Sequence, residues 1–131
     1  GLAFTNVSLG IVHSMAHTIG SFFGISHGLA DAVILPYVIA FNQKDKSTGE
    51  IYTALAKEIG ATDLVEVVKD LNYTLGIAAS LKELIKERRE YLSNLDAMAE
   101  MAKNDGCTKT NPIIPSIEEL KSLFMKAYDG N

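Results

Sequence analysis

The three histidines of the chain, His13, His17 and His27, all fall within its first 27 residues. His13 and His17 are four positions apart, so on a helix they lie about 40° apart on one face, one turn from each other. Imidazoles at that spacing can offer two nitrogens to one metal ion, and a turn through Gly20 and Gly24 would fold His27 back toward them. Imidazole ligands suit iron, zinc, copper and nickel alike, so the residue type does not choose the metal.

Histidines in such a pattern can also be satisfied core or interface residues, and this interpretation stays open. The metal interpretation gains support because neutral imidazoles are costly to bury without partners and because catalytic metal sites commonly use three protein ligands. No H-E-x-x-H motif is present, and the only nearby carboxylate is Asp31. For Asp31 a charge at a helix terminus is the favoured interpretation, and a partner for a histidine is the alternative. The chain by itself therefore offers a half-site.

The segment 1–42 contains a single charged residue, Asp31. Such a segment is either buried against other protein or placed in a membrane. A membrane helix needs about 20 continuous apolar residues, and the histidines, Asn6 and Asp31 interrupt the run here. We therefore predict burial inside a larger protein and no membrane association.

The composition is that of one globular domain, with 131 residues of which 47% are hydrophobic. The net charge of -4 and the lack of a basic stripe argue against a nucleic-acid partner. Cys107 is the only cysteine, which rules out an internal disulfide and fits a reducing, cytoplasmic location. The chain begins at Gly1 rather than at methionine, and we interpret it as part of a longer protein.

Helical patterns recur along the whole chain, and no alternating pattern is long enough for a convincing strand. We predict an all-α bundle of five to seven helices. The second helix, beginning after an N-cap at Ser26, is apolar nearly all round, which predicts a central buried helix kinked at Pro36. The expected helices cover roughly residues 7–22, 26–41, 49–59, 62–75, 84–102 as one helix or two, and 117–127, with loops at 42–48 and 105–115.

Several helix starts are marked by capping patterns. Glu66 is placed for a capping-box contact to Asp63, and the string from Ser80 to Glu83 is a further capping-box pattern. Ser116 opens the last helix. No G-x-G-x-x-G motif follows a strand pattern, so the chain lacks the phosphate loop of a nucleotide-binding unit.

Two separated motifs in this sequence resemble those of a known family. The first is the string GLAFTNVSLGIVHSMAH at residues 1–17, and the second is the loop CTKTNP at residues 107–112, followed by a short acidic helix. Together they resemble the iron-containing (group III) alcohol dehydrogenases across essentially the whole chain. The first motif is continued by Gly20, His27-Gly28, Ala32, Leu35-Pro36, Val38 and Phe41-Asn42.

The resemblance implies that residues 1–131 form the all-helical, metal-binding C-terminal domain of a two-domain enzyme. The upstream domain, which binds NAD or NADP, is absent from this chain. The metal, Fe²⁺ with Zn²⁺ as the alternative, is held in the family by one Asp and three His. Two of these positions match His13 and His27, and the other two lie upstream. Spacing alone favours His13 with His17 as the chelating pair, and we follow the family in pairing His13 with His27.

The resemblance also implies roles for residues that are not ligands. His17 matches a histidine near the metal that is associated with catalysis as a proton relay. Phe4 and Cys107 match positions that line the substrate pocket, although taken alone Phe4 is better explained as core and Cys107 as an inert loop residue. Where the family usually has an Arg after Asn-Pro, this chain has Ile113, which puts in doubt any contact made by that Arg.

The resulting prediction is an NAD(P)-linked dehydrogenase that interconverts a primary alcohol and its aldehyde. The metal is expected to act as a Lewis acid, hydride to pass to the nicotinamide, and a neutral histidine to accept the proton. The isolated chain is predicted to be inactive, and the full-length protein to be a homo-oligomer. Two alternatives are a non-enzymatic metal-binding module that uses His13, His17 and His27 together, and a helical bundle without a ligand.

Overall fold

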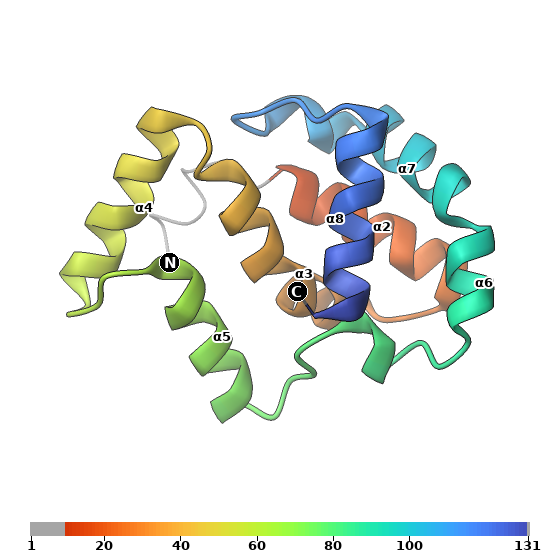
Figure 1. Cartoon of the computed structure of the whole chain (residues 1–131), viewed down its shortest axis with the longest axis horizontal. Helices are drawn as coiled ribbons and strands as arrows, with labels where there is room; N and C mark the ends of the chain where they lie inside the picture. Colours follow the sequence, from red (N-terminus) through yellow and green to blue (C-terminus); the bar gives the residue numbers. More distant parts are fainter. Residues whose placement is uncertain (1–9, 131) are drawn as a thin grey trace.

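The computed structural model describes residues 10–130 of the chain. These residues form seven α-helices and two short 3-10 helices, and no strand occurs among them (Figure 1), which confirms the all-α prediction. The elements in chain order are α2 (Gly10–Phe23), α3 (His27–Asn42), α4 (Lys46–Glu58), α5 (Leu64–Thr74), η1 (Leu81–Glu83), α6 (Arg88–Ser93), α7 (Leu95–Asn104), η2 (Gly106–Thr110) and α8 (Ile117–Asp129).

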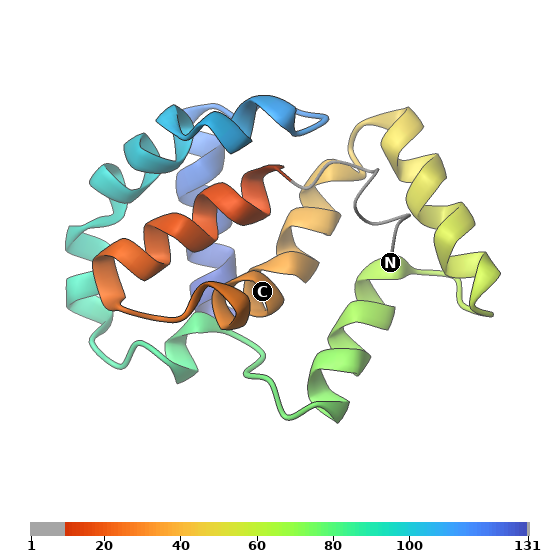
Figure 2. The same ribbon diagram turned by 180° about the vertical axis from the view of Figure 1, so that it is seen from behind.

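Helix α3 is the central element, as its nearly uniform apolarity predicts. Figures 1 and 2 show α4 and α5 on one side of it and α2, α6, α7 and α8 on the other. The larger hydrophobic core joins α2, α3, α7 and α8 and includes the fully buried Val33 of α3. In a smaller core, Ile39 of α3 packs with Tyr52 of α4 and Val68 of α5. Pro36 lies inside α3 without ending it.

A three-residue connection turns the chain between α2 and α3. Gly24 has a φ of 70°, in the left-handed region that glycine adopts without strain, and its amide donates to the Gly20 carbonyl at 3.0 Å. The predicted turn is present, although Gly20 belongs to α2 and only Gly24 makes the reversal. Ser26 occupies the N-cap position of α3 but makes no side-chain capping bond. The turn brings the first residues of α3 beside α2.

Two helix starts differ from the prediction because local side chains cap the backbone. The predicted loop at 42–48 is shorter, since the Asp45 carboxylate accepts from the amide and hydroxyl of Thr48 and α4 begins at Lys46. The pattern at Ser80 gives only a 3-10 turn. There the Glu83 carboxylate accepts from the Ala79 amide at 3.0 Å, and the Ser80 side chain makes no capping bond.

Other boundaries follow the sequence signals. Asp63 caps α5 by accepting from the Val65 amide, although the described hydrogen bonds include none from Glu66 to Asp63. The stripe at residues 84–102 begins just after η1 and forms the two helices α6 and α7. Helix α8 starts with a complete capping box between Ser116 and Glu119.

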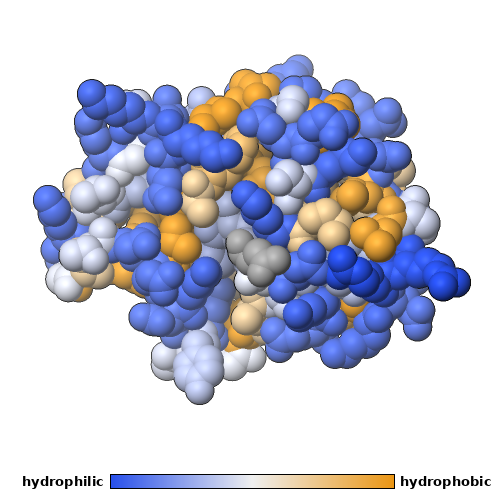
Figure 3. All heavy atoms as spheres, in the orientation of Figure 1, coloured by the Kyte–Doolittle hydropathy of each residue, from blue (hydrophilic) through white to orange (hydrophobic). Residues whose placement is uncertain are grey.

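The surface carries few large apolar side chains. Figure 3 shows mainly hydrophilic residues on the face seen in Figure 1, with apolar residues gathered in smaller patches. Within residues 10–130, none of the helices combines the length and apolarity that crossing a bilayer would require.

The start of α2 lies directly against the loop that contains η2. A Cβ atom added to Gly10 would come within 1.9 Å of the Cys107 carbonyl oxygen and 2.5 Å of the Thr110 hydroxyl. The first of these neighbours is backbone, which cannot rotate away as a flexible side chain can. Gly10 is therefore required by the close approach of α2 to this loop.

We expect Gly10→Ala to destabilise the chain by about 1–3 kcal/mol, because the loop must move to admit the methyl group. Gly28→Ala is the matched control, since a Cβ atom there meets nothing within 4 Å and alanine favours the helix. Urea unfolding of both variants measures the difference. Equal stability of the two variants would contradict the packing of Gly10 against the loop.

Candidate metal centre

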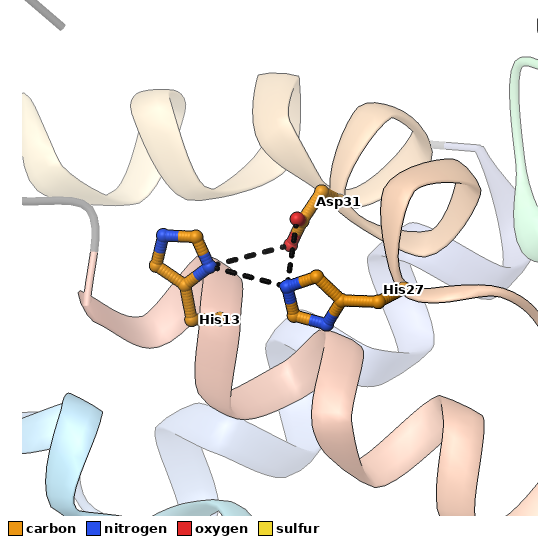
Figure 4. A group of neighbouring side chains, drawn as sticks. All are labelled: His13, His27 and Asp31. Atoms are coloured by element: carbon orange, nitrogen blue, oxygen red, sulfur yellow. Dashed lines mark hydrogen bonds and ion pairs between the residues drawn. The ribbon is translucent and has the colours of Figure 1, made fainter. Parts of the chain in front are cut away.

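Side chains from α2 and α3 converge at the surface where the two helices meet (Figure 4). His13 Nδ1 on α2 lies 3.4 Å from His27 Nε2 at the start of α3. Asp31 stands one turn after His27, and its carboxylate oxygens lie 3.0 Å from His27 Nε2 and 3.7 Å from His13 Nδ1. The two imidazole rings are nearly parallel, with an interplanar angle of 7° and centroids 5.6 Å apart. Two nitrogens and one carboxylate thus face a common point.

These separations are compatible with ligands of a single ion. Donor atoms that each lie about 2.1 Å from a metal are about 3.0 Å apart in octahedral geometry and about 3.4 Å apart in tetrahedral geometry. Two imidazoles and one carboxylate form a donor set that non-haem Fe(II) proteins use with open positions left on the metal. In the described chain, the buried Asp31 Oδ1 has no hydrogen-bond partner. An unpaired buried carboxylate oxygen beside two imidazoles is what a cation would satisfy.

The electrostatics of Asp31 point the same way. Burial raises the pKa of its carboxyl above the ordinary value, against the lowering effects of His27, His13 and His17. The carboxylate is thus only partly compensated by the groups of this chain. The His13 and His27 side chains are 52% and 45% exposed, against 26% for Asp31, so the cluster is open to a ligand from outside.

His17 lies beside this cluster but has a different partner. Its Nδ1 is 2.9 Å from the Asp105 carboxylate, and its ring stacks on that of His27 with centroids 4.8 Å apart. The three histidines therefore come together as the sequence suggests, yet the one-turn pair of His13 and His17 is not the pair with facing nitrogens. The nitrogen of His13 faces His27.

Cys107 lies in η2, partly buried, next to the same aspartate. Its backbone amide donates to Asp105 Oδ1 at 2.9 Å. Burial, a hydrogen bond to Asp105 and its negative charge raise the pKa of the Cys107 thiol, so the thiol is protonated at neutral pH and is not a thiolate nucleophile. Phe4, the other predicted pocket residue, lies outside the described residues.

A buried polar seam holds the loop of Cys107 against α2. The Thr108 hydroxyl is 2.6 Å from the Ser14 hydroxyl and donates to the Ala102 carbonyl at 2.5 Å. Asn111 and Asn42 form a reciprocal amide pair, at 2.7 Å in one direction and 3.2 Å in the other. The seam fixes α2, the end of α3 and the loop relative to one another, and thereby the residues that they carry.

The sequence pattern does not predict the contacts that two acidic residues make with the histidines. For Asp31 the sequence favours a helix-terminus charge and leaves a partner for a histidine as the alternative, and the carboxylate contacts His27 as that alternative states. A signal was available, because Asp31 is the only charge in residues 1–42 and stands four positions after a histidine. Asp105 was placed in a loop without a role. Its contact with His17 joins residues 88 positions apart, and no local pattern encodes such a pairing.

Comparisons with known proteins identify the family of the chain. The family model of the C-terminal part of the Fe-containing alcohol dehydrogenase family matches residues 1–128. An alcohol dehydrogenase of Thermococcus barophilus is 40% identical over 98% of this chain and 34% of its own length. An NADPH-dependent butanol dehydrogenase of Clostridium saccharobutylicum is 41% identical over 99% of this chain and 35% of its own length.

The fold is found in a solved structure of an iron-containing alcohol dehydrogenase from Thermococcus thioreducens. The two superpose with a TM-score of 0.83 and 38% identity, over 92% of this chain and 32% of that one. The chain belongs to the Fe-containing alcohol dehydrogenase family and corresponds to its C-terminal helical domain. It spans about a third of the length of the relatives it matches.

Ile113, which stands where the family usually has an Arg, packs against the main core, and its carbonyl accepts from Asn111.

We expect Asn111→Ala to destabilise the chain by about 1–3 kcal/mol, because the buried Asn42 Oδ1 would lose the amide that donates to it. Asn104→Ala, at an exposed position on α7, is the control and should change stability by less than about 0.5 kcal/mol. The free energy of unfolding in urea distinguishes them. A cost for Asn111→Ala no larger than that of the control would mean that the amide pair does not hold the seam.

Proposed function

We propose that this chain is the metal-holding part of an alcohol dehydrogenase that interconverts a primary alcohol and its aldehyde with a nicotinamide cofactor. The observation that carries the proposal is the convergence of His13 Nδ1, His27 Nε2 and the Asp31 carboxylate at separations of 3.0–3.7 Å. Membership of the iron-containing family supports Fe²⁺ as the ion. Zn²⁺ is the alternative, because it accepts the same nitrogen and oxygen donors.

Residues of this chain would hold the metal and manage the proton. His13 and His27 bind the ion, and Asp31 places a negative charge beside them. The bound metal supplies Lewis-acid chemistry to the alcohol oxygen. His17, stacked on His27, is close enough to the site to take up the proton that the alcohol loses. The protonated Cys107 thiol and Phe4 would line the substrate pocket as uncharged groups.

The remaining parts of the enzyme would come from upstream of this chain. In this proposal an upstream helix contributes an Asp and a His to the metal, and the preceding domain binds NAD or NADP and covers the half-exposed histidines. One relative is an NADPH-dependent butanol dehydrogenase, and the choice between NAD and NADP here would depend on the upstream domain. We expect the isolated chain to be inactive, and the full-length protein to be a cytoplasmic homo-oligomer that acts on a small alcohol or aldehyde.

Metal binding by the isolated chain tests the ligand assignment. We expect weak Co²⁺ binding, because two of the four ligands that the family implies lie outside the chain. Loss of a group that supports a metal ligand typically weakens metal binding by roughly 10- to 100-fold. We expect Asp31→Asn to weaken Co²⁺ binding within that range and His27→Ala to weaken it by more. His17→Ala should leave the affinity nearly unchanged. Titration followed by visible Co²⁺ absorption gives the affinities.

The same titration separates the proposal from a non-enzymatic module that uses all three histidines. Such a module requires His17→Ala to weaken Co²⁺ binding as much as His27→Ala does. If the chain binds neither Co²⁺ nor any other divalent ion, the helical bundle without a ligand is the remaining interpretation.

Activity of the full-length protein that contains this chain tests the role of His17. We expect His17→Ala to lower kcat for alcohol oxidation by about 100-fold or more, because the proton acceptor is lost. The metal content measured by elemental analysis should not change. Loss of the metal in this variant would reassign His17 as a ligand.

A further inference from the structure

Asp105 is held in one orientation by the backbone that follows it. It lies between the end of α7 and the start of η2, where it acts as the N-cap. Its Oδ1 accepts from the Cys107 amide at 2.9 Å, and its Oδ2 lies 2.9 Å from His17 Nδ1. The Asp105 side chain is 20% exposed, against 49% for His17. The better-buried, backbone-anchored group of the pair is therefore the carboxylate.

The contact determines which nitrogen of His17 carries the proton. An ionised carboxylate has no hydrogen to donate, so His17 Nδ1 must be the donor. In the neutral imidazole the Nε2 lone pair is then free to accept a proton. Burial works to raise the pKa of Asp105, but hydrogen bonds from the Cys107 amide, from His17 and from the Cys107 thiol outweigh it and keep the pKa below its ordinary value. The carboxylate is thus ionised at neutral pH.

Resting on the proposed function, we infer that Asp105 is a positioning residue that fixes the His17 ring and its Nδ1–H tautomer, so that Nε2 is the proton acceptor next to His27. A rotated ring, or the other tautomer, would present a hydrogen atom where the acceptor lone pair is needed. The stacking of His17 on His27, at 4.8 Å between centroids, limits the ring to one side of the metal-binding histidines. Asp105 acts through His17 and needs no contact with the substrate.

The grouping of His17, Asp105 and Cys107 is explained by hydrogen bonds and needs no second metal ion. Donor atoms of His17, Asp105 and Cys107 lie within 4.8 Å of one another. However, both Asp105 oxygens already accept hydrogen bonds from this chain, one from the Cys107 amide and one from His17, so the carboxylate is engaged without an ion. The cluster is satisfied without an ion, unlike the cluster of Asp31.

The tautomer can be measured directly on the ¹⁵N-labelled 131-residue chain. In Asp105→Asn the Oδ1 atom can keep its bond to the Cys107 amide, and the new NH₂ group then faces His17 Nδ1 as a donor. Long-range ¹H–¹⁵N correlation spectra at alkaline pH, where imidazoles are neutral, should show His17 as Nδ1–H in the wild type and as Nε2–H in the variant. An Nε2–H wild type, or the same tautomer in both proteins, would overturn the inference.

Kinetics of the full-length protein provide the second readout. We expect Asp105→Asn to lower kcat by about 100-fold, the scale of a lost proton-transfer group, with KM and metal content unchanged. Asp96→Asn is the matched control, because Asp96 is an exposed aspartate of α7 whose partner among residues 10–130 is Lys121. Its kcat should equal that of the wild type, and thermal unfolding checks that both variants fold.

Different outcomes would overturn the proposed function and the role of Asp105. A full-length wild type without dehydrogenase activity would overturn the proposed function while leaving the measured tautomer in place. An active wild type whose kcat survives Asp105→Asn would overturn the role of Asp105 and leave the enzyme assignment in place.

Discussion

Helix α2 is held on two faces, and the placement of the histidines follows from these contacts. Gly10 at its start lies so close to the Cys107 carbonyl that no larger residue fits, and Ser14 bonds with Thr108 in the same loop. Another face of the helix is buried in the main core. With both faces fixed, the helix can neither slide nor rotate. His13 and His17 are consequently presented at one place, toward the beginning of α3.

Charge is scarce around the histidines, and each charged group there has a distinct neighbour. Asp31 lies against His13 and His27, and one of its oxygens has no hydrogen-bond partner in the described part of the chain, whereas Asp105 has both oxygens engaged. Asp31, whose carboxylate has an oxygen without a hydrogen bond, belongs to the site that we propose for the metal. Asp105, whose two oxygens both accept hydrogen bonds, contacts His17, the histidine that we propose as proton carrier. Two aspartates in one small region thus acquire different tasks from the number of hydrogen bonds that each receives.

Much of the fold was predictable because helix signals are local. The capping box at Ser116 and the apolar stripes gave the helices their places, whereas the start of α4 was missed because the capping by Asp45 was not recognised. The candidate site was less accessible to local reasoning. Spacing favours a chelating pair within α2 and the glycine turn brings His27 near it, but the choice of His27 as the partner of His13 comes from the family resemblance. The contact of Asp105 with His17 depends on how α7 and η2 pack on α2, which the sequence pattern does not reveal.

The division of the core into two parts has a consequence for motions within the domain. Helices α4 and α5 pack on α3 through a small separate cluster around Ile39, while the histidines sit on the segment supported by the larger core. Small clusters are the places where proteins open locally at low free-energy cost. On this basis we expect α4 and α5 to open at a lower free-energy cost than the part of the domain that the larger core supports and that carries the histidines.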